Sequence, residues 1–165
     1  MITRDEISSD EIHIDAPVEV VWKVLTDFGN YGKWNSFCPQ AEAKLEVGEP
    51  IRMIIDLGFG PMDWQETITL VEPNKAIAWG LENKPGDPLN AIRTQSLTRL
   101  SESTCSYISV DKFWGEDVTT NFTDLNQALA SRLQYTGPLS IAAGIESGFN
   151  SCGLGLKQYA EQQCS

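Results

Sequence analysis

The fold is decided by the sequence IAAGIESGFNSCGLGLKQY, residues 141–159. Its apolar residues recur at steps of four, four, three, four and three positions, at Ile141, Ile145, Phe149, Cys152, Leu156 and Tyr159. This spacing predicts one long amphipathic helix with a single buried stripe. Glycines occupy positions 144, 148, 153 and 155 of the same segment, although each costs about 1 kcal/mol of helix stability relative to alanine. We therefore expect this helix to need close approach or free space where it faces a sheet or a ligand.

The middle of the chain alternates with a period of two and predicts the sheet against which this helix packs. Strands are expected at 41–47, 51–57, 64–71, 75–81, 91–100 and 104–114, joined by short segments rich in Gly, Pro, Asn or Ser. Links of this length favour antiparallel neighbours, because parallel strands need long crossovers. The six strands therefore form a meander, and the helix stripe must lie on the concave face of a curved sheet.

One strand and two short helices are expected before the meander. Residues 11–15 alternate as a strand, Pro17 opens a helix, and Gly29 ends it. The stretch DFGNYGKWNSFCP (27–39) then has an aromatic residue at every third position, at Phe28, Tyr31, Trp34 and Phe37. This stretch is interpreted either as a second short helix packed into the core or as the wall of a cavity. The chain is thus an α+β protein with about seven strands.

Composition and charge disfavour several classes of partner. The 165 residues fit a single domain, 1–165, and the net charge of −11 disfavours nucleic acid and membrane surfaces. No apolar run is long enough for membrane insertion, and the N-terminus lacks the apolar centre of a secretory signal. The cysteines are scattered, so we expect reduced thiols in a cytoplasmic protein. His13 is the one histidine, and we expect no metal and no cofactor.

Three segments carry a resemblance to a known family. They are IHIDAPVEVVWKVLTDFGNYGKWNSF (12–37), YISVDKFWG (107–115) and GFNSCGLGLKQYAE (148–161). With them the chain resembles the START/Bet v 1-like superfamily, and within it the polyketide cyclase/dehydrase-like group often called SRPBCC. The resemblance implies the helix-grip fold, in which a curved antiparallel sheet wraps around a long C-terminal helix. Members of the superfamily typically hold an apolar ligand between the sheet and that helix.

Residues 116–136 depart from the pattern of the family. Phe122, Leu125, Leu129 and Leu133 have helical spacing, so the segment forms a longer helical insertion than the family implies. Two interpretations are open, namely a lid over the mouth of the cavity or padding of the surface.

The resemblance also implies candidate site residues. It places Tyr107, Asp111 and Phe113 toward the cavity, and if Arg93 lies opposite Asp111, a carboxylate–guanidinium pair forms inside an apolar pocket. Such a pair could orient a ligand carbonyl and, with Tyr107 as proton donor, support enolisation or dehydration. The competing interpretation is a hydrogen-bonded brace between strands. The expected ligand-binding residues are Trp34, Phe37, Met53, Trp64, Trp79, Gln95, Phe113, Ile145 and Phe149.

Two functions remain open at this point. The first is binding of a small hydrophobic molecule, which could be a lipid, a polyketide or an aromatic compound. The second is a polyketide cyclase/dehydratase-type enzyme that uses Tyr107, Asp111 and Arg93 in the same cavity. A protein-binding role is less favoured, because no exposed apolar stripe is apparent. No feature of the sequence sets an oligomeric state.

Overall fold

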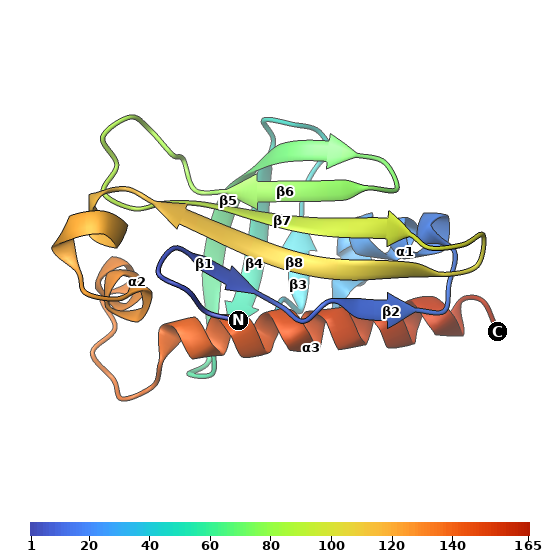
Figure 1. Ribbon diagram of the computed structural model, residues 1–165. Coiled ribbons are helices and arrows are strands. Elements are labelled where there is room, and N and C mark those ends of the chain that lie inside the picture. The colour runs from blue at the N-terminus through green and yellow to red at the C-terminus, as the bar shows by residue number, and fades with distance from the viewer.

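An eight-stranded antiparallel sheet curves around the C-terminal helix α3 (Figure 1). The computed structural model describes residues 1–165. The elements follow in the order β1 (Glu6–Ser8), β2 (Ile12–Ile14), α1 (Val18–Thr26), η1 (Phe28–Lys33), β3 (Gln40–Glu42), β4 (Pro50–Asp56), β5 (Pro61–Glu72), β6 (Ala76–Gly80), β7 (Asn90–Arg99), β8 (Cys105–Trp114), η2 (Asp117–Asn121), α2 (Leu125–Leu133) and α3 (Ile141–Gln162). This arrangement is the helix-grip fold expected from the sequence.

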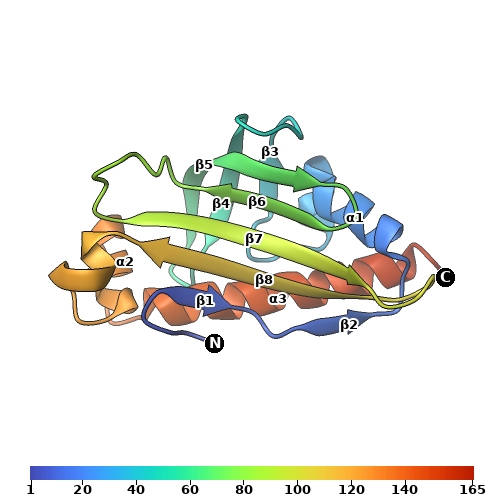
Figure 2. The ribbon, with the colours of Figure 1, turned by 45° about the horizontal axis from the view of Figure 1, so that its top comes forward.

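The strand order in the sheet is β1-β8-β7-β6-β5-β4-β3, so β3 to β8 form the expected meander. Strands β1 and β2 both pair with β8. Strand β2 pairs with the beginning of β8 and β1 pairs nearer its end, so β1 and β2 lie one after the other along the same edge of the sheet (Figure 2). The β7–β8 register places Arg93 directly opposite Asp111, as the sequence suggested.

The helices cover the concave side of the sheet and its two ends. Helix α3 runs along the sheet, with α1 at one end and α2 at the other (Figure 1). Its inward side is formed mainly by Ile141, Phe149, Cys152, Leu156 and Ala160, each of which is buried. These residues belong to one continuous hydrophobic core that includes side chains from every strand from β4 to β8.

Glycines let α3 approach the rest of the chain more closely than a side chain would permit. A Cβ at Gly144 would overlap the carbonyl oxygen of Leu57, and one at Gly155 would overlap the carbonyl oxygen of Trp34. A Cβ at Gly148 would overlap the ring of Phe37. The expectation that these glycines serve close approach is therefore met, and backbone contact is the main reason.

The strands β1 and β3 differ most from those expected. Strand β1 was not anticipated, because Glu6–Ser8 contains a single apolar residue and forms its strand by pairing with the edge of β8. The strand expected at 41–47 is limited to Gln40–Glu42. Leu45 and Val47 continue the alternation in the sequence, but both are exposed, so the pattern there did not reflect burial.

The insertion at 116–136 is helical in two pieces. A π-helical turn, η2, is followed by α2, whose N-terminus is capped by the Asp124 side chain accepting a hydrogen bond from the Gln127 N–H at 2.9 Å. None of the helices in the structure combines the length and the apolar composition that a membrane span requires.

We expect Gly155→Ala to lower the free energy of unfolding by about 1–3 kcal/mol, because the new methyl group would collide with the Trp34 carbonyl and force α3 away from it. Alanine has the higher helix propensity, so propensity alone predicts the opposite sign. Chemical denaturation monitored by circular dichroism measures the change. Gly29→Ala is the matched control, since a Cβ at Gly29 meets no atom within 4 Å. Equal or greater stability of Gly155→Ala would contradict the prediction.

Candidate functional site

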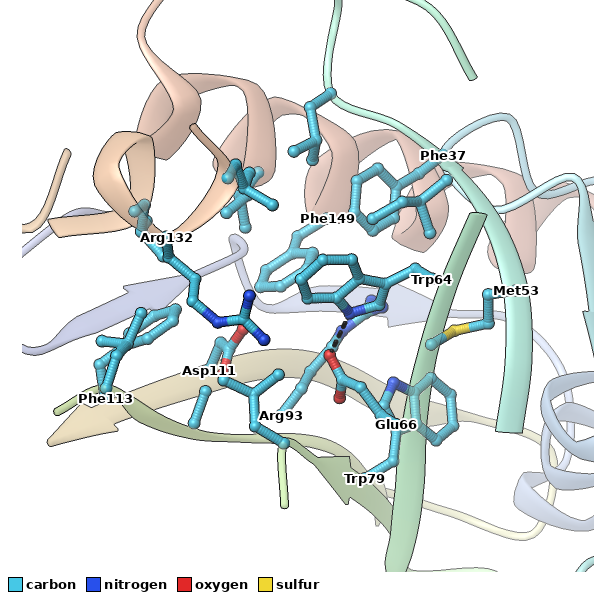
Figure 3. A pocket seen from close by; sticks show the side chains of 18 residues that line it. Phe37, Met53, Trp64, Glu66, Trp79, Arg93, Asp111, Phe113, Arg132 and Phe149 are labelled. Carbon is cyan, nitrogen blue, oxygen red and sulfur yellow. Dashed lines mark hydrogen bonds between the residues drawn. The ribbon is translucent and has the colours of Figure 1, made fainter. Parts of the chain in front are cut away.

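A cavity lies between the concave face of the sheet and helices α2 and α3 (Figure 3). Eighteen residues line it and fourteen of them are hydrophobic. The hydrophobic ones are Phe37, Met53, Ile55, Leu57, Trp64, Trp79, Leu81, Leu89, Ala91, Phe113, Leu129, Leu133, Ile145 and Phe149. The other four carry charged groups and are Glu66, Arg93, Asp111 and Arg132. An apolar lining with a few convergent polar groups is typical of small-molecule sites.

The cavity is narrow in its present conformation. About 690 Å³ between the lining residues is free of protein atoms, but this volume includes space that is open to solvent. The interior volume that the centres of water molecules can occupy is only about 80 Å³. An interior of this size holds a handful of waters. A ligand with two or more rings would therefore have to displace lining side chains or the helix that carries some of them.

Arg93 forms the floor of the cavity and is held by neutral partners. It is only 6% exposed, and its Nε donates a hydrogen bond to Ser109 Oγ at 2.8 Å and its Nη2 to Gln95 Oε1 at 3.3 Å. Its guanidinium carbon lies 4.0 Å from the centroid of the Phe149 ring. Burial acts to lower the pKa of Arg93, but Tyr107, Cys152 and Asp111 together raise it, so the buried group stays charged.

Asp111 lies opposite Arg93, yet the expected ion pair is absent. The Arg93 side chain turns instead toward Ser109, its diagonal neighbour on β8, and toward Gln95 on its own strand. Asp111 Oδ1 is left buried without a hydrogen-bond partner. The expectation of a carboxylate–guanidinium pair was therefore wrong, because strand register fixes which residues are neighbours but not the direction that a long side chain takes.

Electrostatics keep the Asp111 carboxyl in its protonated form over an extended pH range. Burial raises its pKa well above the ordinary value, the Glu66 carboxyl raises it further, and Arg93 opposes both effects. A protonated carboxyl can donate a hydrogen bond as well as accept one. The cavity thus contains an unpartnered polar group that is able to bind a ligand oxygen.

Two charged residues of the cavity were missed by the sequence analysis. Glu66 Oε1 accepts a hydrogen bond from Trp64 Nε1 at 2.7 Å (Figure 3), and burial raises the pKa of Glu66 against the opposing effects of Trp64 and Arg93. It could have been found, since residues two apart on a strand share a face and Trp64 was expected in the cavity. Arg132, on α2, lies in the segment 116–136, for which the resemblance implied no site residues.

The structure divides the residues expected at the site into two groups. The cavity is lined by Phe37, Met53, Trp64, Trp79, Arg93, Asp111, Phe113, Ile145 and Phe149. Trp34, Gln95 and Tyr107 do not line it. Tyr107 and Gln95 lie behind Arg93, where the tyrosine hydroxyl donates to Gln95 Oε1 at 2.7 Å, and burial raises the pKa of Tyr107. Catalytic roles for Tyr107, Asp111 and Arg93 remain predictions.

The aromatic stretch 27–39 serves both purposes that the sequence left open. Phe28, Tyr31 and Trp34 pack edge to face in the core. The ring centroids of Phe28 and Tyr31 are 5.5 Å apart, and those of Tyr31 and Trp34 are 4.9 Å apart. Phe37 instead lines the cavity and contacts Phe149 edge to face, with centroids 5.6 Å apart. The stretch is therefore core at its beginning and cavity wall at its end.

Helix α2 forms one side of the cavity through Leu129, Arg132 and Leu133. Just beyond it, Tyr135 stacks on Phe59 at the tip of the β4–β5 hairpin, with ring centroids 4.7 Å apart and planes inclined by 18°. This partly exposed aromatic pair is thus one of the contacts holding the C-terminal end of α2 against the sheet. A lid role for 116–136 stays a prediction.

Comparison with known proteins identifies relatives of the whole fold. A family model described as polyketide cyclase/dehydrase and lipid transport matches residues 7–104. No curated protein matches the chain significantly.

Several solved structures share the architecture along nearly the whole chain. The Zhui aromatase/cyclase from Streptomyces sp. R1128 is 16% identical, with a TM-score of 0.68, covering 97% of this chain and 95% of that one. A protein from Thermus thermophilus is 13% identical, with a TM-score of 0.66 and coverages of 97% and 99%. A norcoclaurine synthase point mutant from Thalictrum flavum, in complex with a transition-state analogue, is 12% identical, with a TM-score of 0.56 and coverages of 97% and 96%. At these identities the likeness shows the fold alone.

The raised pKa of Asp111 should make the free energy of unfolding depend on pH. The folded protein retains a proton on Asp111 that the unfolded chain releases above the ordinary pKa of 3.8, so this group makes the wild type less stable as pH rises from 3.8 toward the raised pKa. Asp111→Asn removes this titration. The free energy of unfolding of the variant, minus that of the wild type, should therefore increase by at least about 1 kcal/mol between about pH 4.5 and about pH 8.

Urea unfolding at a series of pH values measures this difference. Asp63→Asn, which removes a carboxyl at an exposed position on β5, is the matched control. Parallel stability curves for the wild type and Asp111→Asn would show that Asp111 does not titrate in the expected way.

Proposed function

Because the chain belongs to the polyketide cyclase/dehydrase and lipid transport family, we propose that it binds a small hydrophobic molecule of aromatic, polyketide or lipid character in the cavity beneath α2 and α3. The resemblance to the START/Bet v 1-like superfamily inferred from the sequence is thereby confirmed. The family is broad in function, so the chemistry of the ligand must be argued from the cavity itself.

One observation carries the proposal, namely the unpartnered Asp111 Oδ1 in an otherwise apolar cavity. A buried polar atom without a hydrogen bond costs about 1–3 kcal/mol. A ligand whose carbonyl or hydroxyl oxygen approached Asp111 would recover this energy. Trp34 Nε1 in the core also lacks a partner, but Asp111 lines a cavity where a ligand can reach it, so its missing hydrogen bond favours a binding site.

The aromatic residues of the lining also indicate the shape of the ligand. Trp64, Trp79 and Phe149 present ring surfaces around the charged floor at Arg93 (Figure 3). Aromatic faces favour planar, polarisable ligands. We therefore propose a ligand with a flat apolar body and at least one oxygen that lies between Asp111 and Arg93.

Binding should require displacement of α2. The cavity is too narrow for a molecule with two rings, and Leu129, Arg132 and Leu133 occupy the side that α2 provides. The loss of one stacked pair, Phe59 with Tyr135, would free the C-terminal end of this helix from the hairpin tip. In this proposal the insertion 116–136 acts as the lid of the cavity.

A test of binding uses N-phenyl-1-naphthylamine, an uncharged dye that fluoresces in apolar surroundings. Ile145→Trp, at the cavity lining on α3, should fill the space and weaken dye binding by about tenfold or more. Leu154→Trp adds a ring of the same kind on the exposed side of the same helix and should leave binding unchanged. Fluorescence titration measures both, with thermal unfolding to verify folding. Equal affinity of wild type and Ile145→Trp would refute binding in this cavity.

An enzyme of the cyclase/dehydratase kind is the second candidate, favoured by the presence of two carboxyls with raised pKa beside a buried guanidinium. Glu66, when ionised, would remove a proton next to a ligand carbonyl, and Arg93 would stabilise the resulting enolate oxygen. Asp111 would donate its proton to a departing hydroxyl, which would leave as water. Tyr107 lies outside the lining, so its role in this mechanism would be to position Gln95 and Arg93.

Proton abstraction can be tested with 2-tetralone, a bicyclic ketone, by following exchange of its α-protons for deuterium in D₂O by NMR. An enzyme should accelerate the exchange over buffer, and Glu66→Gln should reduce that acceleration by about a hundredfold. Glu49→Gln, on the segment that precedes β4, is the control and should retain it. If the wild type does not accelerate exchange while the dye still binds, the binding function stands and this catalytic mechanism is refuted.

A further inference from the structure

We propose that the ligand of this cavity carries an anionic group, such as a carboxylate, which Arg132 binds at the mouth. This inference rests on the proposed binding function and narrows the class of ligand to amphipathic acids. The apolar body would lie among the aromatic rings, and the anionic end would remain near solvent.

Arg132 is a cation without a partner. It makes no hydrogen bond or ion pair within the chain, and its guanidinium carbon lies 5.8 Å from the centroid of the Trp64 ring. Arg4, Arg93 and Arg99 are engaged by a carbonyl, by neutral side chains and by Glu19, respectively, whereas Arg52 also lacks a partner but lies exposed on β4, away from the cavity. In a protein with a net charge of −11, carboxylate partners are abundant. An unpaired arginine at the opening of a cavity is therefore available to a ligand.

Arg132 lies where the polar end of an amphipathic ligand would be expected, between the apolar cavity and the polar surface. Arg132 lines the apolar cavity and also an adjoining polar hollow, whose other members include Gln65, Thr67, Glu82 and Asp87. Figure 3 shows its guanidinium reaching from α2 toward the centre of the cavity, on the same side as Asp111. A group held here would lie at the boundary between the apolar interior and water.

The charges around the cavity favour an anion despite the acidic surface of the protein. The two guanidinium groups at the cavity stay charged, whereas burial raises the pKa of Glu66 and of Asp111 and disfavours their ionised forms. In the polar hollow, Glu82 forms an ion pair with Lys84 at 2.6 Å, and Asp87 accepts a hydrogen bond from the Lys84 N–H. Of the acidic residues that line the cavity and the hollow with Arg132, Glu66 and Asp111 are half-buried, and Glu82 and Asp87 already have partners.

Stabilisation of the helix end does not account for Arg132. Basic residues in the last turn of a helix interact favourably with its dipole, but the end of α2 is already closed by its backbone. Gln134 adopts a left-handed conformation, and its N–H donates hydrogen bonds to the carbonyl oxygens of Ala130 and Ser131. Figure 3 shows the guanidinium of Arg132 directed into the cavity, as expected of a group that recognises a ligand.

Two dyes with the same aromatic skeleton provide the test. 1-Anilinonaphthalene-8-sulfonate carries one sulfonate, and N-phenyl-1-naphthylamine lacks it. Arg132→Gln should weaken binding of the sulfonate dye about five- to tenfold and change that of the uncharged dye by less than about twofold. Arg52→Gln is the matched control, because Arg52 is also unpaired but lies exposed on β4, away from the cavity. It should leave both affinities unchanged.

A carboxylate is tested directly by competition. 1-Naphthoic acid should displace N-phenyl-1-naphthylamine from the wild type more effectively than its methyl ester does, and Arg132→Gln should remove this preference. If Arg132→Gln weakens both dyes equally, Arg132 acts through packing on Trp64 and the inference is overturned. Equal competition by acid and ester in the wild type overturns it as well. If neither dye binds the wild type, the binding function itself fails, and the inference fails with it.

Discussion

The close contact between α3 and the backbone around it is the constraint on which the rest of the structure depends. Gly144 and Gly155 touch the carbonyls of Leu57 and Trp34, and these two positions are separated by about 16 Å along the helix. Between them, Phe149 faces the guanidinium of Arg93. Helix α3 is thus fixed to the chain at two points, and the cavity lies between α2, α3 and the concave face of the sheet.

The buried guanidinium determines the chemistry of this space. Arg93 is satisfied by hydroxyl and amide oxygens and by aromatic faces, and no carboxylate is needed to hold it. As a consequence Asp111 is left without an ionic partner in an apolar setting, where its neutral form is the more stable one. The buried cation Arg93, the neutral acid Asp111 and a second acid, Glu66, therefore line the same small cavity, which Arg132 borders from α2. A binding protein and an acid–base enzyme would both use such a set, and turnover distinguishes the two.

The sequence predicted those parts of the fold in which one-sided burial repeats regularly. The stripe from Ile141 to Tyr159 and the alternation of Ile51, Met53 and Ile55 both reflect a single buried face. Strand β1 was not predictable in this way, because its pairing with β8 depends on backbone groups that every sequence has. The family resemblance, and not strand alternation alone, indicated which aromatic residues would line a cavity. The direction of Arg93 depends on side-chain packing in three dimensions, and Arg132 reaches the cavity from α2, whose packing against the cavity was not predicted.

The small volume of the cavity affects the rates at which a ligand would bind and dissociate. If the closed form with Phe59 stacked on Tyr135 dominates in solution, only the small fraction of molecules with α2 displaced can accept a guest. The observed affinity is reduced by that fraction, and association is slower than diffusion would allow. The same barrier slows escape once the guest is inside. Under the proposed binding function, such a protein would hold its ligand for long periods and exchange it at a rate set by the motion of α2.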